Sequence, residues 1–80
     1  MKKQILEEIL KSMAIKASLA NIYKEEEEYK NNMRKCPFYS ELVGMEHTLK
    51  IMGIEFEYEY NKEVTKITAI KANDIYIPVK

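Results

Sequence analysis

Glycine, proline and cysteine are scarce in this chain of 80 residues, which has two glycines, two prolines and one cysteine, Cys36. A single cysteine cannot form an internal disulfide, so we expect a reducing, cytoplasmic environment. The glycines do not form the glycine-rich loop that cradles phosphates, which argues against nucleoside triphosphatases and dinucleotide-dependent enzymes. No apolar run is long enough for a signal peptide or a membrane span, so we expect no membrane partner.

Net charge and histidine are lacking as well. Thirteen basic and thirteen acidic side chains cancel, which argues against general capture of nucleic acid through a basic face. The only histidine is His47, so one chain cannot supply a metal site of several histidines. Cys36 has no second cysteine to complete a zinc pattern. The sequence therefore predicts no metal and no cofactor.

A long N-terminal helix is predicted for residues 2–34, which contain neither glycine nor proline. Its length would be roughly 48 Å, whereas a compact domain of this size is only about 30 Å across. The helix must therefore break near Asn21 or pack against another copy of the chain.

Two apolar stripes follow this helix at the spacing of a coiled-coil seam, and they point in roughly opposite directions. A helix with two opposed apolar stripes needs two packing partners. We therefore expect a dimer or higher oligomer, with an interface that draws on both stripes: Leu6, Leu10, Met13, Ala17, Ile15, Leu19 and Ile22. The alternative is a kink at Asn21 that folds both halves of the helix onto one small core.

A second helix is predicted for residues 37–52, because Pro37 suits its first turn and Gly53 suits a left-handed cap at its end. The back of this helix carries an apolar and aromatic strip. We interpret this strip, with a further exposed tyrosine, as a binding surface for another subunit or a target: Tyr39, Val43, His47, Lys50, Ile51 and Tyr76. Alternatively, the first helix covers the strip within the same chain.

From Ile54 the hydropathy period changes to two, which predicts a three-stranded antiparallel meander over residues 54–79. The fold class is therefore α+β, with the order ααβββ in a single domain of residues 1–80 and the second helix covering the sheet.

Turn chemistry sets the expected strand register. Asn73 and Asp74 suit a two-residue turn that pairs Ala72 with Ile75, and Pro78 indicates a sheet edge. A three-residue first loop would pair Tyr60 with Val64. That register also places Ile54 opposite Ile70, and Lys66 inside the sheet opposite Tyr58.

The carboxylates of Glu55, Glu57 and Glu59 alternate along one face of the first strand. Such a row could bind a divalent ion or act in acid–base chemistry, but a solvated outer face explains it more simply. No catalytic arrangement stands out, so we expect a protein that is not an enzyme.

The segment Glu41–Tyr58 resembles small accessory proteins of prophages from low-GC Gram-positive bacteria. The resemblance implies an inhibitor that binds a host defence component, either a protein or its nucleotide signal. The alternative is a regulatory or antitoxin-like structural subunit. Both are non-enzymatic binding proteins.

Overall fold

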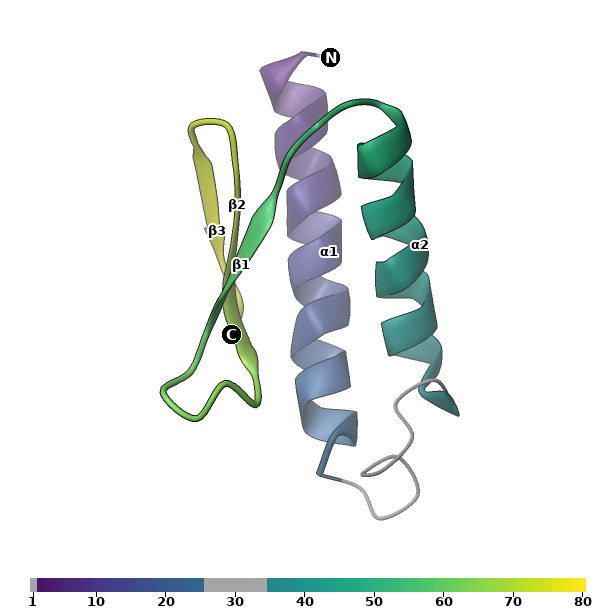
Figure 1. Ribbon diagram of the computed structural model, residues 1–80, viewed down its shortest axis with the longest axis vertical. Coiled ribbons are helices and arrows are strands. Elements are labelled where there is room, and N and C mark those ends of the chain that lie inside the picture. The colour runs from purple at the N-terminus through teal and green to yellow at the C-terminus, as the bar shows by residue number, and fades with distance from the viewer. Residues whose placement is uncertain (1, 26–34) are drawn as a thin grey trace.

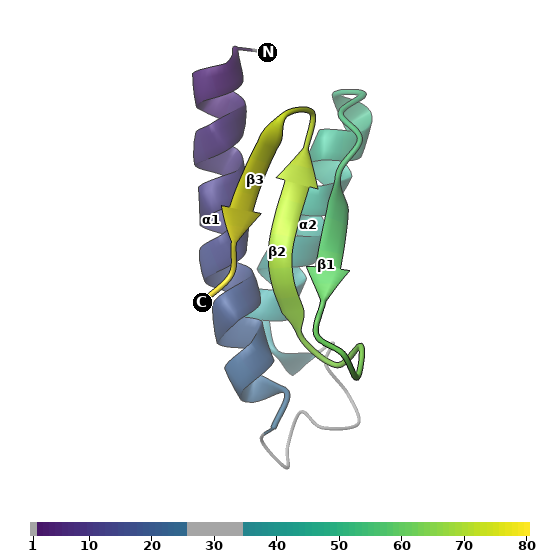
Figure 2. The same ribbon diagram turned by 90° about the vertical axis from the view of Figure 1, so that its left-hand side faces the viewer.

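The computed structural model describes residues 2–25 and 35–80 and has an α+β fold, as the sequence predicts. Two helices, α1 (Lys3–Tyr23) and α2 (Pro37–Ile51), precede three strands. The strands β1 (Glu57–Tyr60), β2 (Ile67–Ala72) and β3 (Ile75–Pro78) form an antiparallel sheet in the order β1-β2-β3. Figure 1 shows α1 between the sheet and α2, and Figure 2 looks onto the sheet with β3 over α1.

The first helix is shorter than the predicted range of residues 2–34. It continues through Asn21, where the alternative prediction placed a kink, and it ends two residues later at Tyr23. Lys24 and Glu25 form a turn, and residues 26–34 lie outside the described residues. Asn21 has a role in tertiary structure instead, because its side chain hydrogen-bonds to the backbone of Ile67 in β2.

The first apolar stripe of α1 forms the centre of the protein's own core. Leu10, Met13 and Ala17 have no exposed surface, and Leu6 is 3% exposed. They pack with residues from α2, β2 and β3: Leu42, Leu49, Ile70, Ala72 and Ile75. The prediction that Leu6, Leu10, Met13 and Ala17 belong to an oligomer interface is therefore corrected, since the chain itself buries them.

The second helix covers the sheet less directly than predicted. It is α1 that packs against β2 and β3, and α2 packs against α1. Side chains of α2 still reach the sheet, because the hydroxyl of Tyr58 in β1 donates a hydrogen bond to the carboxylate of Glu46. Burial of the Tyr58 side chain, and then this hydrogen bond, raise the pKa of Tyr58 above its ordinary value.

The end of α2 confirms the glycine cap. Gly53 has a φ of 75°, in the left-handed region that glycine adopts readily. Its N–H donates to the carbonyl of Lys50 at 3.0 Å, and the N–H of Ile54 donates to the carbonyl of Leu49 at 2.9 Å. These two bonds are those of a Schellman motif.

The register of β2 with β3 is confirmed, whereas that of β1 with β2 differs from the prediction. Ala72 pairs with Ile75 across the turn at Asn73, which has a φ of 55°. Ile70 pairs with Tyr58 rather than with Ile54.

The difference in register arises in the first loop, which is longer than three residues. The side-chain oxygen of Asn61 accepts hydrogen bonds from the backbone N–H groups of Thr65 at 2.8 Å and Lys66 at 3.0 Å. Lys66 therefore precedes β2 instead of facing Tyr58, and its ammonium forms an ion pair with Glu25.

Candidate interaction surfaces

The second stripe of α1 lies on the face opposite the core and is open to solvent. Ile15 is 61% exposed and Ile22 is 59% exposed, while Leu19 is half-buried. Of the seven residues predicted to form an oligomer interface, only these three are available at the surface. We call Ile15, Leu19 and Ile22 the α1 stripe.

A groove runs between the α1 stripe and the edge strand β3. Its volume is about 590 Å³, and most of its lining is apolar. The lining residues come from α1 and from the last residues of the described chain: Lys11, Ala14, Ile15, Ser18, Leu19, Ile77, Pro78 and Lys80. We call this feature the α1–β3 groove.

Local contacts hold the two walls of the α1–β3 groove together and set its charge. The hydroxyl of Ser18 donates a hydrogen bond to the carbonyl oxygen of Lys80 at 2.5 Å, which ties the segment after β3 to α1. The Lys11 ammonium lies 3.3 Å from the carboxylate of Glu7 on the same helix. Among the described residues that line the α1–β3 groove, none is acidic, and the two charged ones are Lys11 and Lys80.

The sequence did not predict the β3 wall of this groove. Pro78 indicated the sheet edge, but nothing in the sequence pattern placed Ile77 beside the first helix. Nothing local along the chain brings Ile77 next to Ile15, because only the packing of α1 on β3 does so.

A second apolar hollow follows the N-terminal half of the exposed face of α1, on the side of α2. Its volume is about 450 Å³, and Ile5, half of whose surface is exposed, lies at its margin. It is lined by Gln4, Ile5, Glu8, Ile9, Ser12 and Met45, and we call it the α1–α2 hollow.

The strip on the back of α2 is exposed as the sequence predicts. Val43 is 42% exposed, Ile51 is 73% exposed, and Tyr39, His47 and Lys50 are exposed as well. The alternative that the first helix covers this strip is wrong, because α1 packs on the side of α2 that carries Leu42 and Leu49.

Tyr76 does not belong to the strip on α2. It lies on β3, and its hydroxyl donates a hydrogen bond to Glu59 of β1 at 2.9 Å, across the outer face of the sheet. The predicted binding surface is therefore divided between two separate parts of the molecule.

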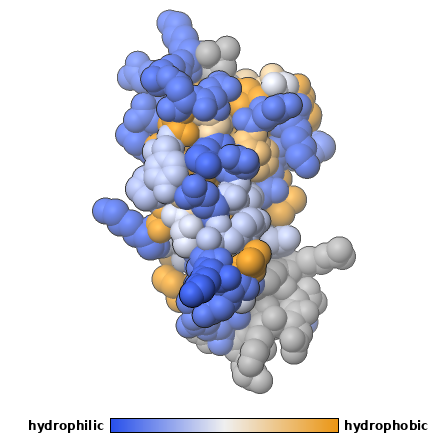
Figure 3. Space-filling view, turned by 60° about the vertical axis from the view of Figure 1, so that its left-hand side comes forward, coloured by the Kyte–Doolittle hydropathy of each residue, from blue (hydrophilic) through white to orange (hydrophobic). Residues whose placement is uncertain are grey.

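The outer face of the sheet is polar. The Lys71 ammonium lies 3.2 Å from Glu57 and 3.3 Å from Glu59. Hydrogen bonds from Tyr76 and then Lys71 lower the pKa of Glu59, and hydrogen bonds to Glu57 and Glu59 raise the pKa of Lys71. Hydrophilic residues cover most of this side, and hydrophobic ones appear mainly towards its margins (Figure 3).

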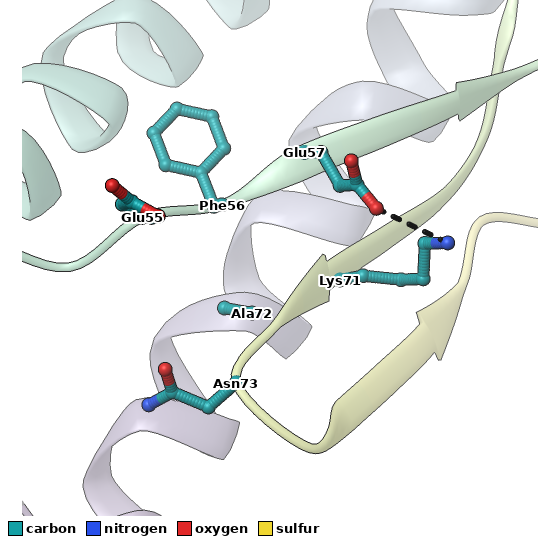
Figure 4. Close-up of a pocket in the computed structure, with 6 residues that line it drawn as sticks. All are labelled: Glu55, Phe56, Glu57, Lys71, Ala72 and Asn73. Atoms are coloured by element: carbon teal, nitrogen blue, oxygen red, sulfur yellow. Dashed lines mark ion pairs between the residues drawn. The ribbon is translucent and has the colours of Figure 1, made fainter.

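A pocket of about 480 Å³ at one end of this face is lined by Glu55, Phe56, Glu57, Lys71, Ala72 and Asn73. Glu57 points towards Lys71, whereas Glu55 lies beyond Phe56 (Figure 4). A cation in this pocket would have to compete with Lys71 for the Glu57 carboxylate. Within residues 2–25 and 35–80, no group of three or more His, Cys, Asp or Glu side chains is arranged to hold a metal ion.

No protein-family model, curated protein or solved structure matches this chain. The resemblance to prophage accessory proteins therefore stays a prediction. Neither described helix combines the length and the apolar character that a membrane-crossing helix requires.

Proposed function

We propose that this protein is a non-enzymatic binding protein that buries the α1 stripe and the α1–β3 groove against another polypeptide. The observation that carries the proposal is the position of the stripe: three large aliphatic side chains lie opposite a core that is already complete without them. An apolar surface of this kind beside a groove is typical of an interaction site.

The energetics favour occupation of this surface. Complete burial of an isoleucine or leucine side chain contributes about 1.5–3 kcal/mol. Ile15 and Ile22 are each about three-fifths exposed, so their burial recovers a substantial part of that. The groove walls at Ala14, Ile77 and Pro78 add apolar contact, which helps to offset the entropy lost on association.

The spacing of the stripe favours a helical polypeptide over a small ligand. Ile15, Leu19 and Ile22 are separated by four and three residues, which is the spacing through which one helix packs on another. Among residues 2–25 and 35–80, none of those that line the α1–β3 groove is an aromatic residue on which a base could stack. The spacing and the lining therefore favour a protein partner over a nucleotide signal, the other target that the sequence analysis considered.

The narrower functions stay predictions. Inhibition of a host defence component, and the alternative of a regulatory or antitoxin-like subunit, are both compatible with a protein-binding face on α1. The polar outer face of the sheet and the strip on α2 give no stronger indication of either.

Photo-crosslinking tests the proposed surface. A benzophenone amino acid placed at Ile15 should form adducts with a polypeptide in the producing cells, because that side chain lies in the proposed interface. The same group at Lys62, which is exposed in the loop between β1 and β2, is the control. Absence of polypeptide adducts at Ile15, or equal adducts at Lys62, would contradict the proposal.

A further inference from the structure

We infer that the occupant of this face is a second copy of the chain, with the two α1 helices antiparallel in a symmetric dimer. The inference rests on the proposed function, because it assigns a partner to the same surface. Three features of α1 support it: the spacing of its exposed residues, the fit between its two halves, and the placement of its charges.

The exposed and half-buried residues on this face of α1 form a seam that can pack against an identical seam. Ser12, Ile15, Leu19 and Ile22 follow one another at steps of three, four and three residues, which is the repeat of a coiled-coil seam. A second copy supplies the same seam. In an antiparallel pair with the two-fold axis near Ala17, Ile15 lies level with Leu19 of the second copy.

In the same register, the exposed Ile22 side chain of each copy faces the α1–α2 hollow of the other. Ile22 of the second copy lies level with Ser12, since each is about 7.5 Å from the axis at 1.5 Å per residue. Ser12 is small and lines the apolar α1–α2 hollow beside Ile9 and Met45. The exposed Ile22 of each copy therefore meets the hollow of the other, and the symmetry forms this contact twice.

Two charged side chains of α1, those of Glu8 and Lys11, favour the antiparallel orientation. A parallel pair would set Glu8 and Lys11 each against its own copy, and both side chains are more than half exposed. The antiparallel pair separates these like charges by about 18 Å or more along the helix axis. The formal net charge of zero adds no overall repulsion between copies.

Sedimentation equilibrium tests whether the partner is a second copy of the chain. The wild-type chain should be dimeric at about 200 µM, a concentration at which a pair with micromolar Kd is associated. Ile22→Asp should be monomeric with an unchanged circular dichroism spectrum, because Ile22 is outside the core. The control Ile51→Asp changes an isoleucine on α2 that is even more exposed, at 73% against 59% for Ile22, and it should stay dimeric. A monomeric wild type, or dissociation by both variants, would overturn the inference.

Disulfide trapping tests the orientation, in a background in which the buried Cys36 is changed to alanine. A disulfide requires Cα atoms within about 7 Å. In the antiparallel dimer the two copies of Ser12 are about 15 Å apart along the axis, and so are the two copies of Ile22. Only a mixture of the Ser12→Cys and Ile22→Cys variants should therefore give a cross-linked dimer. Cross-linking of Ser12→Cys with itself, or no cross-linking in the mixture, would overturn the arrangement.

The two proposals fail in different ways. Adducts from Ile15 to a different polypeptide, together with a monomeric wild type, would overturn the inference that the partner is a second copy. They would still support the proposed function. No polypeptide adduct at Ile15 would contradict both.

Discussion

The side-chain amide of Asn21 on α1 binds both backbone hydrogen-bonding groups of Ile67 at the start of β2. Its nitrogen donates to the Ile67 carbonyl at 2.9 Å, and its oxygen accepts from the Ile67 N–H at 3.1 Å. Strand β3 ends at Pro78, and the last bond across the two strands joins the Val79 N–H to Thr68. The Asn21 side chain thus supplies hydrogen-bond partners to the backbone of β2 just beyond the end of β3.

Removing this amide should destabilise the protein. Asn21→Ala leaves the half-buried N–H and C=O of Ile67 without these partners, which costs about 1–3 kcal/mol of unfolding free energy. Urea denaturation followed by circular dichroism measures the change. Gln4→Ala, an exposed change on the same helix, should have little effect. Equal losses in the two variants would show that the Ile67 contact contributes nothing.

The two stripes of α1 should respond differently to truncation. Leu10→Ala removes a side chain with no exposed surface and should lower the unfolding free energy by about 2–5 kcal/mol. Ile15→Ala should cost much less within one chain, because Ile15 is 61% exposed. Denaturation at low protein concentration, where association contributes least, measures both. Similar costs at the two positions would contradict the assignment of one stripe to the core.

The loop between β1 and β2 contains a residue in an unfavourable conformation. Val64 has a φ of 57°, a region that β-branched side chains rarely adopt, and it is 68% exposed. Val64→Gly should therefore raise the thermal midpoint, because relief of backbone strain of about 1–3 kcal/mol outweighs the added freedom of the unfolded chain. In contrast, Val43→Gly within α2 should lower it. A lower midpoint for Val64→Gly would contradict this account of the loop.

Alkaline pH should weaken the fold through Tyr58. The pKa of Tyr58 is raised in the folded state by burial and by the bond to Glu46, while in the unfolded chain it is about 10. The unfolded state therefore loses a proton more readily, and the stabilisation present below about pH 10 is lost as the pH rises further. Urea denaturation between pH 8 and about pH 11 should show a steeper decline for the wild type than for Tyr58→Phe. The exposed Tyr39→Phe is the control and should decline almost as steeply as the wild type, because Tyr39 makes the smallest contribution to the raised pKa of Tyr58.

The sequence predicted the elements that depend on local patterns. The apolar periods identified both helices and the meander, and the pair Asn73–Asp74 gave the register of β2 with β3. The β1–β2 register was wrong because the Asn61 side chain organises a longer loop, which hydropathy does not reveal. Similarly, the sequence showed two stripes on the first helix but could not decide which one the chain buries.

The candidate site was harder to predict than the fold. Three of the seven predicted interface residues lie at or beside the groove: Ile15, Leu19 and Ile22. The other wall of the groove comes from Ile77 and Pro78, which are more than 50 residues away in the sequence. Such a contact follows from tertiary packing and has no local signal. Tyr76 joined the predicted surface as an exposed tyrosine, and its bond to Glu59 places it elsewhere.

The central position of α1, in contact with α2, β2 and β3, also governs how the protein opens. Neither α2 nor the sheet can separate from the rest without exposing Leu10 and Met13, which the whole core shares. The amide protons around Leu10 should therefore exchange with solvent only when the entire molecule unfolds, and they should be among the slowest to exchange. Detachment of β1 alone leaves the packing of α1 on α2, β2 and β3 in place, so the amides of β1 should exchange through a smaller and more frequent opening.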